Sequence, residues 1–184
     1  MNAICVIPAR YASTRLPGKP RRYICGKTMI SRVYERARRS KTVSEVIVAT
    51  DDERIFKAVE ENSGKAIMTR AAHKTGTDRL AEVAEKFPDA DLIVNVQGDE
   101  PLIEGSLIDE LVAEFLRDET LQMATVATEL TDEAEMNNPN NVKVTFDNYH
   151  DALYFSRSLI PYPRNSGKAK VYKHIGIYAY RREF

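Results

Sequence analysis

The chain has 184 residues, a length that suits one domain or one domain with a small appendage. Hydrophobic residues make up 43% and charged residues 29%, a balance that supports a sizeable core and excludes a disordered chain. The 27 Lys and Arg equal the 27 Asp and Glu, which argues against a general nucleic-acid or membrane-surface binder.

The two cysteines, Cys5 and Cys25, have no metal-type spacing and form no disulfide framework. Cys5 falls in an apolar run and is expected to be a small core residue. The N-terminus has no signal-peptide pattern, and no apolar run approaches the length of a membrane span. We therefore expect a cytoplasmic protein in a reducing compartment.

Apolar runs and helical patterns alternate over the first two-thirds of the chain. Strands are expected at 3–7, 45–50, 65–68 and 91–96, and helices at 29–39, around 55–59, at 77–87 and at 105–117. Asp51 and Asp52 offer caps for the second of these helices. This alternation is typical of a parallel sheet with helices on both faces.

The pattern changes after Leu121, where strands are expected at 123–129, 142–146, 152–156 and 171–180 with little helix between them. Prolines and asparagines punctuate this part of the chain. We expect a single domain over 1–184, with an α/β part at 1–120 and a strand-rich part at 121–184.

Ligands of open α/β sheets bind beyond the C-terminal ends of the strands. The first strand is followed by a loop with Arg10, Arg15 and Lys19. Arg grips phosphate through two hydrogen bonds and Lys acts as a point charge, so the loop suits a ligand with several anionic oxygens. Neither GxxxxGK[ST] nor GxGxxG occurs. The alternative is a basic surface loop.

The fourth strand ends in the segment QGDEP, which contains Asp99. A carboxylate that faces a phosphate loop is a natural Mg²⁺ ligand, because Mg²⁺ prefers one or two carboxylates together with phosphate oxygens. The alternative is that Asp99 caps the next helix or turn.

The third strand is followed by a polar segment, 69–79, that opens a helix. Its backbone groups and threonine hydroxyls could line a base or sugar pocket. The alternative is an ordinary helix start capped by Thr75 or Thr77, with His73 on the surface. Farther along, Arg157 could pair with a substrate carboxylate and His174 could hydrogen-bond a polyol.

Charge is unevenly spread along the chain. Residues 10–41 hold eleven Lys or Arg and one acid, and residues 97–119 hold eight acids and one base. The two segments could form an anion site and a cation site, or they could be solvated helix faces.

Seven segments occur together in one order: IPARYASTRLPGKP, VATDD, MTRAAHKTGTDRLAEV, VNVQGDEP, VKV, ALYFSRSLIPYPR and KHIGIYAYRR. In these the chain resembles the 3-deoxy-manno-octulosonate (Kdo) cytidylyltransferases nearly from end to end. PYPR and GIYAYRR are most similar to the capsule-associated members. The resemblance implies a nucleotide-diphospho-sugar transferase fold, with a mixed, mainly parallel sheet, helices on both faces and a strand-rich dimerisation extension.

The resemblance also implies the reaction CTP + Kdo → CMP-Kdo + pyrophosphate, for lipopolysaccharide or capsule synthesis, with Mg²⁺ as cofactor. It assigns catalytic roles to Lys19, Arg10, Arg15 and Asp99, with the three cations on the CTP triphosphate and Asp99 on the metal. The implied cytosine and ribose pocket comprises Thr69, Arg70, His73, Thr75, Gly76 and Thr77. The implied sugar-acid side comprises Gln97, Arg157, Arg164 and His174.

Three further expectations come with the resemblance. The strand-rich part matches the region through which two subunits pair, which implies a homodimer. The family continues beyond the position of Phe184 with a helix carrying LEQLR and another metal-binding aspartate, neither of which is in this sequence, so a shortened chain is expected. The alternatives are transfer to another sugar acid, such as 8-amino-Kdo or sialic acid, and an inactive nucleotide-binding fragment.

Overall fold

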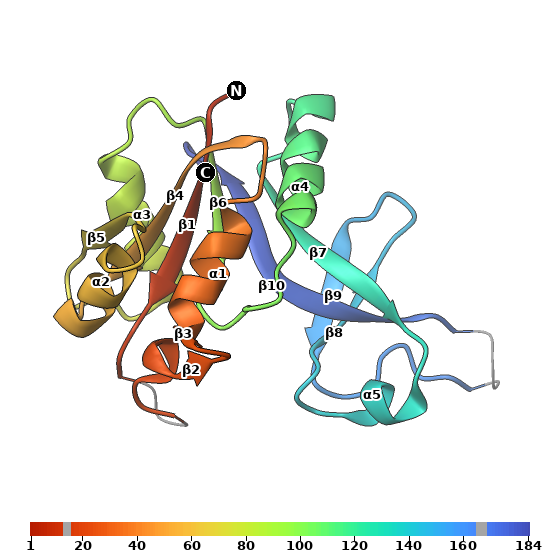
Figure 1. The fold of residues 1–184 in the computed structure, drawn as a ribbon. Helices are drawn as coiled ribbons and strands as arrows, with labels where there is room; N and C mark the ends of the chain where they lie inside the picture. Colours follow the sequence, from red (N-terminus) through yellow and green to blue (C-terminus); the bar gives the residue numbers. More distant parts are fainter. Residues whose placement is uncertain (13–15, 165–168) are drawn as a thin grey trace. The chain divides into compact units, whose positions relative to one another are not determined.

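The computed structural model describes residues 1–12, 16–164 and 169–184 (Figure 1). The chain divides into two compact units. Unit 1 comprises Met1–Ala124 and Ile177–Phe184, and unit 2 comprises Thr125–Gly176. The boundary lies close to the expected division at residue 120, but the last segment of the chain, expected in the strand-rich part, lies in unit 1.

Unit 1 is built on four parallel strands in the order β5 (Ala66–Met68), β4 (Val43–Thr50), β1 (Ala3–Ala9) and β6 (Leu92–Val96). The last part of β10 (Val171–Arg181) pairs antiparallel with β6, with Ile177 opposite Val96. The sheet is therefore mixed and mainly parallel. Cys5 is fully buried in β1, as expected, and burial raises the pKa of its thiol to about 12.

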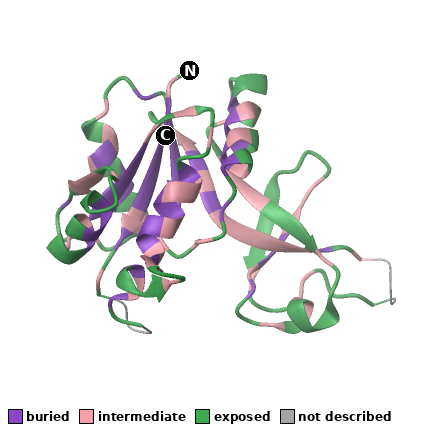
Figure 2. Cartoon of the chain, in the orientation of Figure 1, coloured by how far each residue is buried: buried purple, intermediate pink, exposed green. Residues whose placement is uncertain are grey.

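Four helices accompany these strands: α1 (Met29–Ala37), α2 (Glu53–Glu60), α3 (Gly76–Glu85) and α4 (Gly105–Arg117). Leu80 and Val83 of α3 pack on one face of the sheet against Val6 and Ile47. The other helices lie on the opposite face, where α1 contacts both α2 and α4. Figure 2 shows the central strands buried along most of their length, as strands covered on both faces must be. Among the described residues, no helix is long and apolar enough to cross a membrane.

The helix starts follow ordinary capping chemistry. The Asp52 carboxylate accepts the Arg54 backbone N–H at the start of α2. Thr75 and Asp78 form a capping box at the start of α3, in which the side chain of each accepts the backbone N–H of the other. Of the caps expected from the sequence, Asp52 and Thr75 are therefore the ones used.

Four short elements escape the sequence pattern: the 3₁₀ turn η1 (Lys19–Arg21), strands β2 (Tyr23–Ile24) and β3 (Lys27–Thr28), and helix α5 (Glu133–Asn137). Strands of two residues are too short to display a period of two, and α5 buries no residue, so it has no apolar stripe. The β2–β3 turn has positive φ at Cys25 (47°) and Gly26 (80°).

Unit 2 is an antiparallel sheet. It contains β7 (Met123–Leu130, from Thr125 onward), β8 (Lys143–Phe146), β9 (Ala152–Ser156) and the first part of β10. β8 pairs with β9, with Val144 opposite Phe155, and with β10, with Val144 opposite Tyr172. β7 pairs with β10, which leaves β9 at the other end of the strand order. These strands match the expected ones to within one or two residues at their ends.

Candidate functional site

The loop after β1 is held against the start of α2. The backbone N–H of Gly18 donates to the carbonyl of Tyr11 at 2.9 Å, and the Arg54 guanidinium lies 3.3 Å from the centre of the Tyr11 ring. Gly18 has φ 67°, which side chains rarely adopt, and a Cβ there would lie 3.1 Å from the Tyr11 ring. Both the backbone conformation and the lack of space therefore favour glycine at this position. Arg15, one of the three predicted phosphate ligands, lies outside the described residues.

Lys19 and Asp99 form the central contact of the site. The Lys19 ammonium lies 2.5 Å from the Asp99 carboxylate, and the two side chains are 36% and 48% exposed. Helix α4 begins after Glu104, so Asp99 does not cap it. The structure thus joins the predicted basic loop after β1 to the predicted acidic loop after β6, at the edge of the sheet where ligands of such folds bind.

Two glycines of the site, Gly98 and Gly76, lie close to Pro8, near the end of β1. A Cβ on Gly98 would lie 2.9 Å from the Pro8 carbonyl oxygen, and a Cβ on Gly76 would lie 3.5 Å from the Pro8 ring. Gly98 therefore lets the loop after β6 approach the backbone of β1. Arg10, two residues beyond Pro8, donates from Nη1 to the Lys74 carbonyl at 3.2 Å, which links the basic loop to the segment that opens α3.

The segment from Thr69 to Thr77 is folded around Glu82 of α3. The Glu82 carboxylate accepts the Arg70 backbone N–H at 3.0 Å and lies 2.5 Å from His73 Nε2. The Arg70 N–H, followed by the His73 contact, lowers the pKa of Glu82 to about 2. His73 is largely buried by this contact, so the surface position considered for it is wrong. Burial, followed by the nearby Tyr178, raises the pKa of Tyr180, and the Thr77 hydroxyl opposes this rise.

A buried network behind this segment was missed by sequence reasoning. Arg79 of α3 is 0% exposed; it donates from Nη2 to the Asp51 carboxylate at 3.0 Å and from Nη1 to the Thr69 hydroxyl. The Thr69 hydroxyl in turn donates to the Thr50 carbonyl at 3.0 Å. The network ties the ends of β4 and β5 to the first turn of α3. The sequence did carry one sign of this burial: Arg79 lies beside Leu80 and one helical turn before Val83, on the apolar stripe of α3.

The predicted sugar-acid residues fall in both units. Gln97 directly follows β6 in unit 1 and is half-buried, whereas Arg157, Arg164 and His174 belong to unit 2. Arg157 donates from Nη1 to the Pro139 carbonyl at 2.9 Å. His174 Nε2 lies 2.9 Å from the Thr125 hydroxyl, its ring meets Phe155 edge-on at 5.0 Å, and burial lowers its pKa. Arg164 is exposed.

The two charged segments of the sequence bind each other away from the loop ends. Asp109 accepts hydrogen bonds from the Ser40 hydroxyl at 2.6 Å and from the backbone N–H groups of Lys41 and Thr42, and Arg36 pairs with Glu104. These contacts, one of them an ion pair, join α1 and its following turn to α4. Among the described charged residues of the two segments, Arg10, Lys19 and Asp99 lie at the candidate site.

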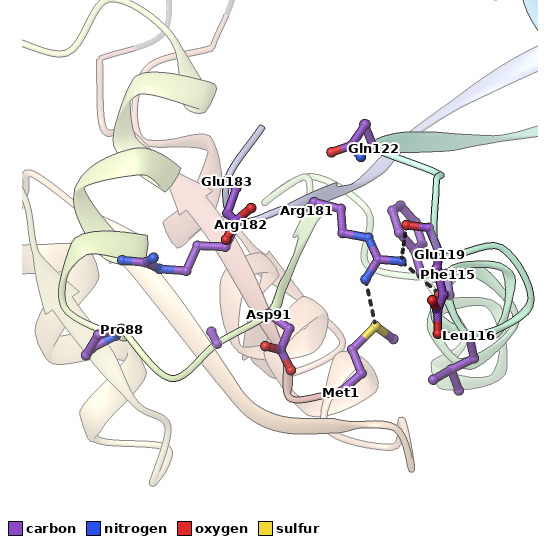
Figure 3. Close-up of a pocket in the computed structure, with 11 residues that line it drawn as sticks. Met1, Pro88, Asp91, Phe115, Leu116, Glu119, Gln122, Arg181, Arg182 and Glu183 are labelled. Atoms are coloured by element: carbon purple, nitrogen blue, oxygen red, sulfur yellow. Dashed lines mark hydrogen bonds between the residues drawn. The ribbon is translucent and has the colours of Figure 1, made fainter.

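A cavity of about 610 Å³ in unit 1 lies away from these loops (Figure 3). Met1, Asp91 and Arg181 line it, which places it at the N-terminal ends of β1 and β6, opposite the loops of the candidate site. The Arg181 guanidinium is already occupied by the carbonyls of Phe115 and Leu121. The candidate residues of unit 1, Arg10, Lys19 and Asp99 among them, lie at the other edge of its sheet, so we place the nucleotide part of the site there.

Comparison with known proteins gives consistent matches. A family model described as cytidylyltransferase matches residues 4–184. A 3-deoxy-manno-octulosonate cytidylyltransferase of Fusobacterium nucleatum is 53% identical over 184 residues, which are 100% of this chain and 75% of the relative. An 8-amino-3,8-dideoxy-manno-octulosonate cytidylyltransferase of Shewanella pealeana is 51% identical, over 100% of this chain and 76% of the relative.

The chain is also similar to a solved structure of a CMP:2-keto-3-deoxy-manno-octonic acid synthetase complexed with CTP. The TM-score is 0.93 at 52% identity, and the match covers 100% of this chain and 75% of that one. The expected fold, a mixed and mainly parallel sheet of nucleotide-sugar transferase type, is confirmed. The chain belongs to the cytidylyltransferase family.

Proposed function

We propose that this chain transfers CMP from CTP to the anomeric hydroxyl of Kdo, giving CMP-Kdo and pyrophosphate. The observation that carries the proposal is the meeting of Lys19 and Asp99 at the C-terminal edge of the sheet. Its specific form is supported by the relatives, which are named for this transfer, and by the similar structure, which is complexed with CTP.

In this reaction the anomeric oxygen forms a bond to the α-phosphorus in line with the departing oxygen. The bond to pyrophosphate breaks, and the hydroxyl proton is released to solvent. Phosphoryl transfer of this kind depends on positioning and charge stabilisation more than on covalent help from the protein. Arg10 and Lys19 would neutralise the charge that builds on pyrophosphate, and we propose the same role for Arg15.

We propose Mg²⁺ as the cofactor, held by Asp99. Among the described residues no three His, Cys, Asp or Glu side chains gather as a metal site. The half-exposed Asp99 carboxylate beside the basic loop does fit a Mg²⁺ ion that takes its remaining oxygens from phosphate and water. Bound there, the ion would supply positive charge to the phosphate oxygens.

Recognition of the nucleoside would rest mainly on backbone groups. The side chains of Thr69, His73 and Thr75 are engaged with Arg79, Glu82 and Asp78. Arg70, Gly76 and Thr77 complete the proposed cytosine and ribose pocket. Gln97, Arg157, Arg164 and His174 would face the sugar acid, in which the carboxylate suits an arginine and the hydroxyls suit Gln97 and His174.

The test is pyrophosphate release by the 184-residue chain with CTP and Mg²⁺, in parallel with calorimetric CTP binding. Kdo, 8-amino-Kdo and sialic acid are compared as acceptors, because relatives named for both of the first two are about equally similar. Fastest release with Kdo is the expected result. CTP binding without release would support the nucleotide-binding fragment, and a faster rate with another sugar acid would overturn the assignment to Kdo.

We further propose a homodimer that forms through β9. Three consecutive large side chains of this terminal strand are exposed: Leu153 (66%), Tyr154 (64%) and Phe155 (43%). A strand of this kind presents both apolar surface and unpaired backbone groups to a second copy. Light scattering should give a dimer, and Leu153→Lys should give a monomer. A monomeric parent chain would contradict the proposal.

We also propose that the protein is located in the cytoplasm and that its product is used for lipopolysaccharide or capsule synthesis. Support for the first is that both cysteines are free thiols, as a reducing compartment allows. Immunodetection in separated cell fractions checks the location, and surface-glycan analysis after gene disruption checks the use of the product.

A further inference from the structure

Lys143, in β8 of unit 2, is a buried cation that has no acidic partner among the residues that the structure describes. Its side chain is 0% exposed, and its ammonium donates to three backbone carbonyls: Asn138 at 3.0 Å, Asn141 at 2.9 Å and Arg157 at 2.7 Å. An ammonium has three N–H donors and no acceptor, so this set satisfies it fully. Burial, followed by the charge of Arg157, lowers the pKa of Lys143.

The three carbonyls come from two separate parts of unit 2. Asn138 and Asn141 belong to the connection between α5 and β8, whereas Arg157 directly follows β9. The connection is further ordered by the Asn141 side chain, which donates to the Glu135 carbonyl at 2.9 Å. Lys143 therefore joins the end of β9 to the connection between α5 and β8.

Arg157 is consequently held at both of its ends. Lys143 binds its carbonyl, and the Pro139 carbonyl accepts from its guanidinium Nη1 at 2.9 Å. Pro139 lies within the loop that Lys143 also binds. The connection between α5 and β8 also contacts His174, another predicted sugar-acid residue of unit 2, because the His174 backbone N–H donates to the Val142 carbonyl at 2.8 Å.

We propose that Lys143 is a positioning residue that acts through Arg157, by fixing both the backbone of Arg157 and the loop that orients its guanidinium. A lysine with no acidic partner is an expensive choice for a core, where an apolar side chain of similar volume costs nothing to desolvate. Its retention here is explained if the three carbonyls must stay in place. The inference rests on the proposed function for its consequence, namely the capture of the sugar-acid carboxylate by Arg157.

The first test compares Lys143→Met with Lys170→Met, a lysine of the same unit that is exposed and paired with Glu129. We expect Lys143→Met to raise the KM for Kdo about tenfold, the scale of one charge-assisted hydrogen bond, with CTP affinity unchanged. Lys170→Met should leave both at the parent values. Loss of CTP binding together with Kdo binding would point to a general structural role and overturn the proposal.

A double-mutant cycle with Arg157→Ala gives the sharper readout. If Lys143 acts through Arg157, adding Lys143→Met to Arg157→Ala changes the KM for Kdo by less than twofold. Independent, multiplicative effects would overturn the proposal. If Arg157→Ala alone leaves the KM for Kdo unchanged, the assignment of Arg157 to the sugar acid fails. In that case amide hydrogen exchange alone decides whether Lys143 positions Arg157.

Amide hydrogen exchange needs no substrate. Removing the ammonium should speed exchange at Asn141, whose N–H donates to the Asn138 carbonyl, while exchange in the parallel strands of unit 1 stays unchanged. Unchanged exchange at Asn141 would overturn the proposal. If Lys143→Met does not fold, Lys143→Gln takes its place, because the amide keeps two N–H donors without the charge.

Discussion

The Lys19 ammonium and the Asp99 carboxylate, 80 residues apart in sequence, lie 2.5 Å from each other. Each neutralises the charge of the other in the free protein. In the proposed function a triphosphate with Mg²⁺ would offer each of them a new partner of the opposite sign, so that one ion pair would be exchanged for two. This relation yields the first two predictions.

Replacing Lys19 by Ala should reduce turnover about a hundredfold or more, because one charge that stabilises the departing pyrophosphate is lost. The measurement is the rate of pyrophosphate release at saturating CTP. Lys27→Ala is the matched control, since Lys27 is a nearby lysine in the chain that pairs with Glu35 instead of Asp99. If Lys19→Ala turns over at the rate of the parent chain, the assignment of Lys19 to the site is wrong.

Asp99→Asn keeps the size of the side chain and removes its charge. We expect half-maximal activity to require at least tenfold more Mg²⁺, because a neutral amide oxygen is a poorer ligand for a hard cation. A Mg²⁺ titration at fixed CTP measures this shift. If the two titration curves coincide, Asp99 is not the metal ligand.

The buried Arg79 network should contribute strongly to stability. Arg79→Met removes the partner of Asp51 and of the Thr69 hydroxyl, and breaking such a buried pair typically costs about 3–5 kcal/mol. The measurement is the urea concentration at the midpoint of unfolding of unit 1, monitored with a probe placed in its sheet. Arg117→Met, at an exposed pair with Glu114, should change stability by no more than about 0.5 kcal/mol. Equal effects of the two variants would contradict the importance of the network.

Acid should loosen the segment that opens α3. The folded-state pKa of Glu82, about 2, lies below its ordinary value of 4.5. The stability contributed by the ionised carboxylate is therefore fully present above about pH 4.5 and is lost as the pH falls toward 2. Amide exchange of Arg70, which donates to Glu82, should lose protection over this range, and Glu82→Gln should lose part of it at neutral pH.

The exposed Glu85 of the same helix provides the control for that experiment. Glu85→Gln should leave Arg70 exchange unchanged at every pH. Protection at Arg70 that persists unaltered in Glu82→Gln would show that the loop does not depend on this carboxylate.

Gly98→Ala and Gly76→Ala each add a methyl group that faces Pro8, at different distances. The new Cβ would lie 2.9 Å from the Pro8 carbonyl oxygen in the first case and 3.5 Å from its ring in the second. Backbone must move in Gly98→Ala, so we expect a loss of about 1–3 kcal/mol. Gly76→Ala makes an ordinary contact at the start of a helix and should not destabilise. Equal midpoints in urea would contradict the close approach.

The sequence predicted the regular elements well because their signals are local. The parallel strands and the four long helices carry apolar runs or stripes, and Thr75 and Asp52 carry recognisable caps. The site was predicted by a topological rule, which places the loops after β1 and β6 at one edge of the sheet. The contact of Lys19 with Asp99 is the direct result of that arrangement.

The features that were missed depend on tertiary contacts. The buried state of Arg79 depends on Asp51 and Thr69, which belong to other elements, and that of Lys143 depends on three backbone carbonyls that no side-chain pattern reveals. Similarly, the antiparallel pairing of β10 with β6 brings together segments that are far apart in the chain, so no local period could indicate it.

That pairing bears on how the protein is made. While the chain grows, β6 is complete long before residues 177–181, the segment that will cover its outer edge. A nascent unit 1 therefore carries a strand of apolar residues with one row of unpaired amides and carbonyls, the kind of edge onto which another chain can add. The sheet of unit 1 is completed only after all of unit 2 has been synthesised, so this edge is exposed to aggregation during that interval.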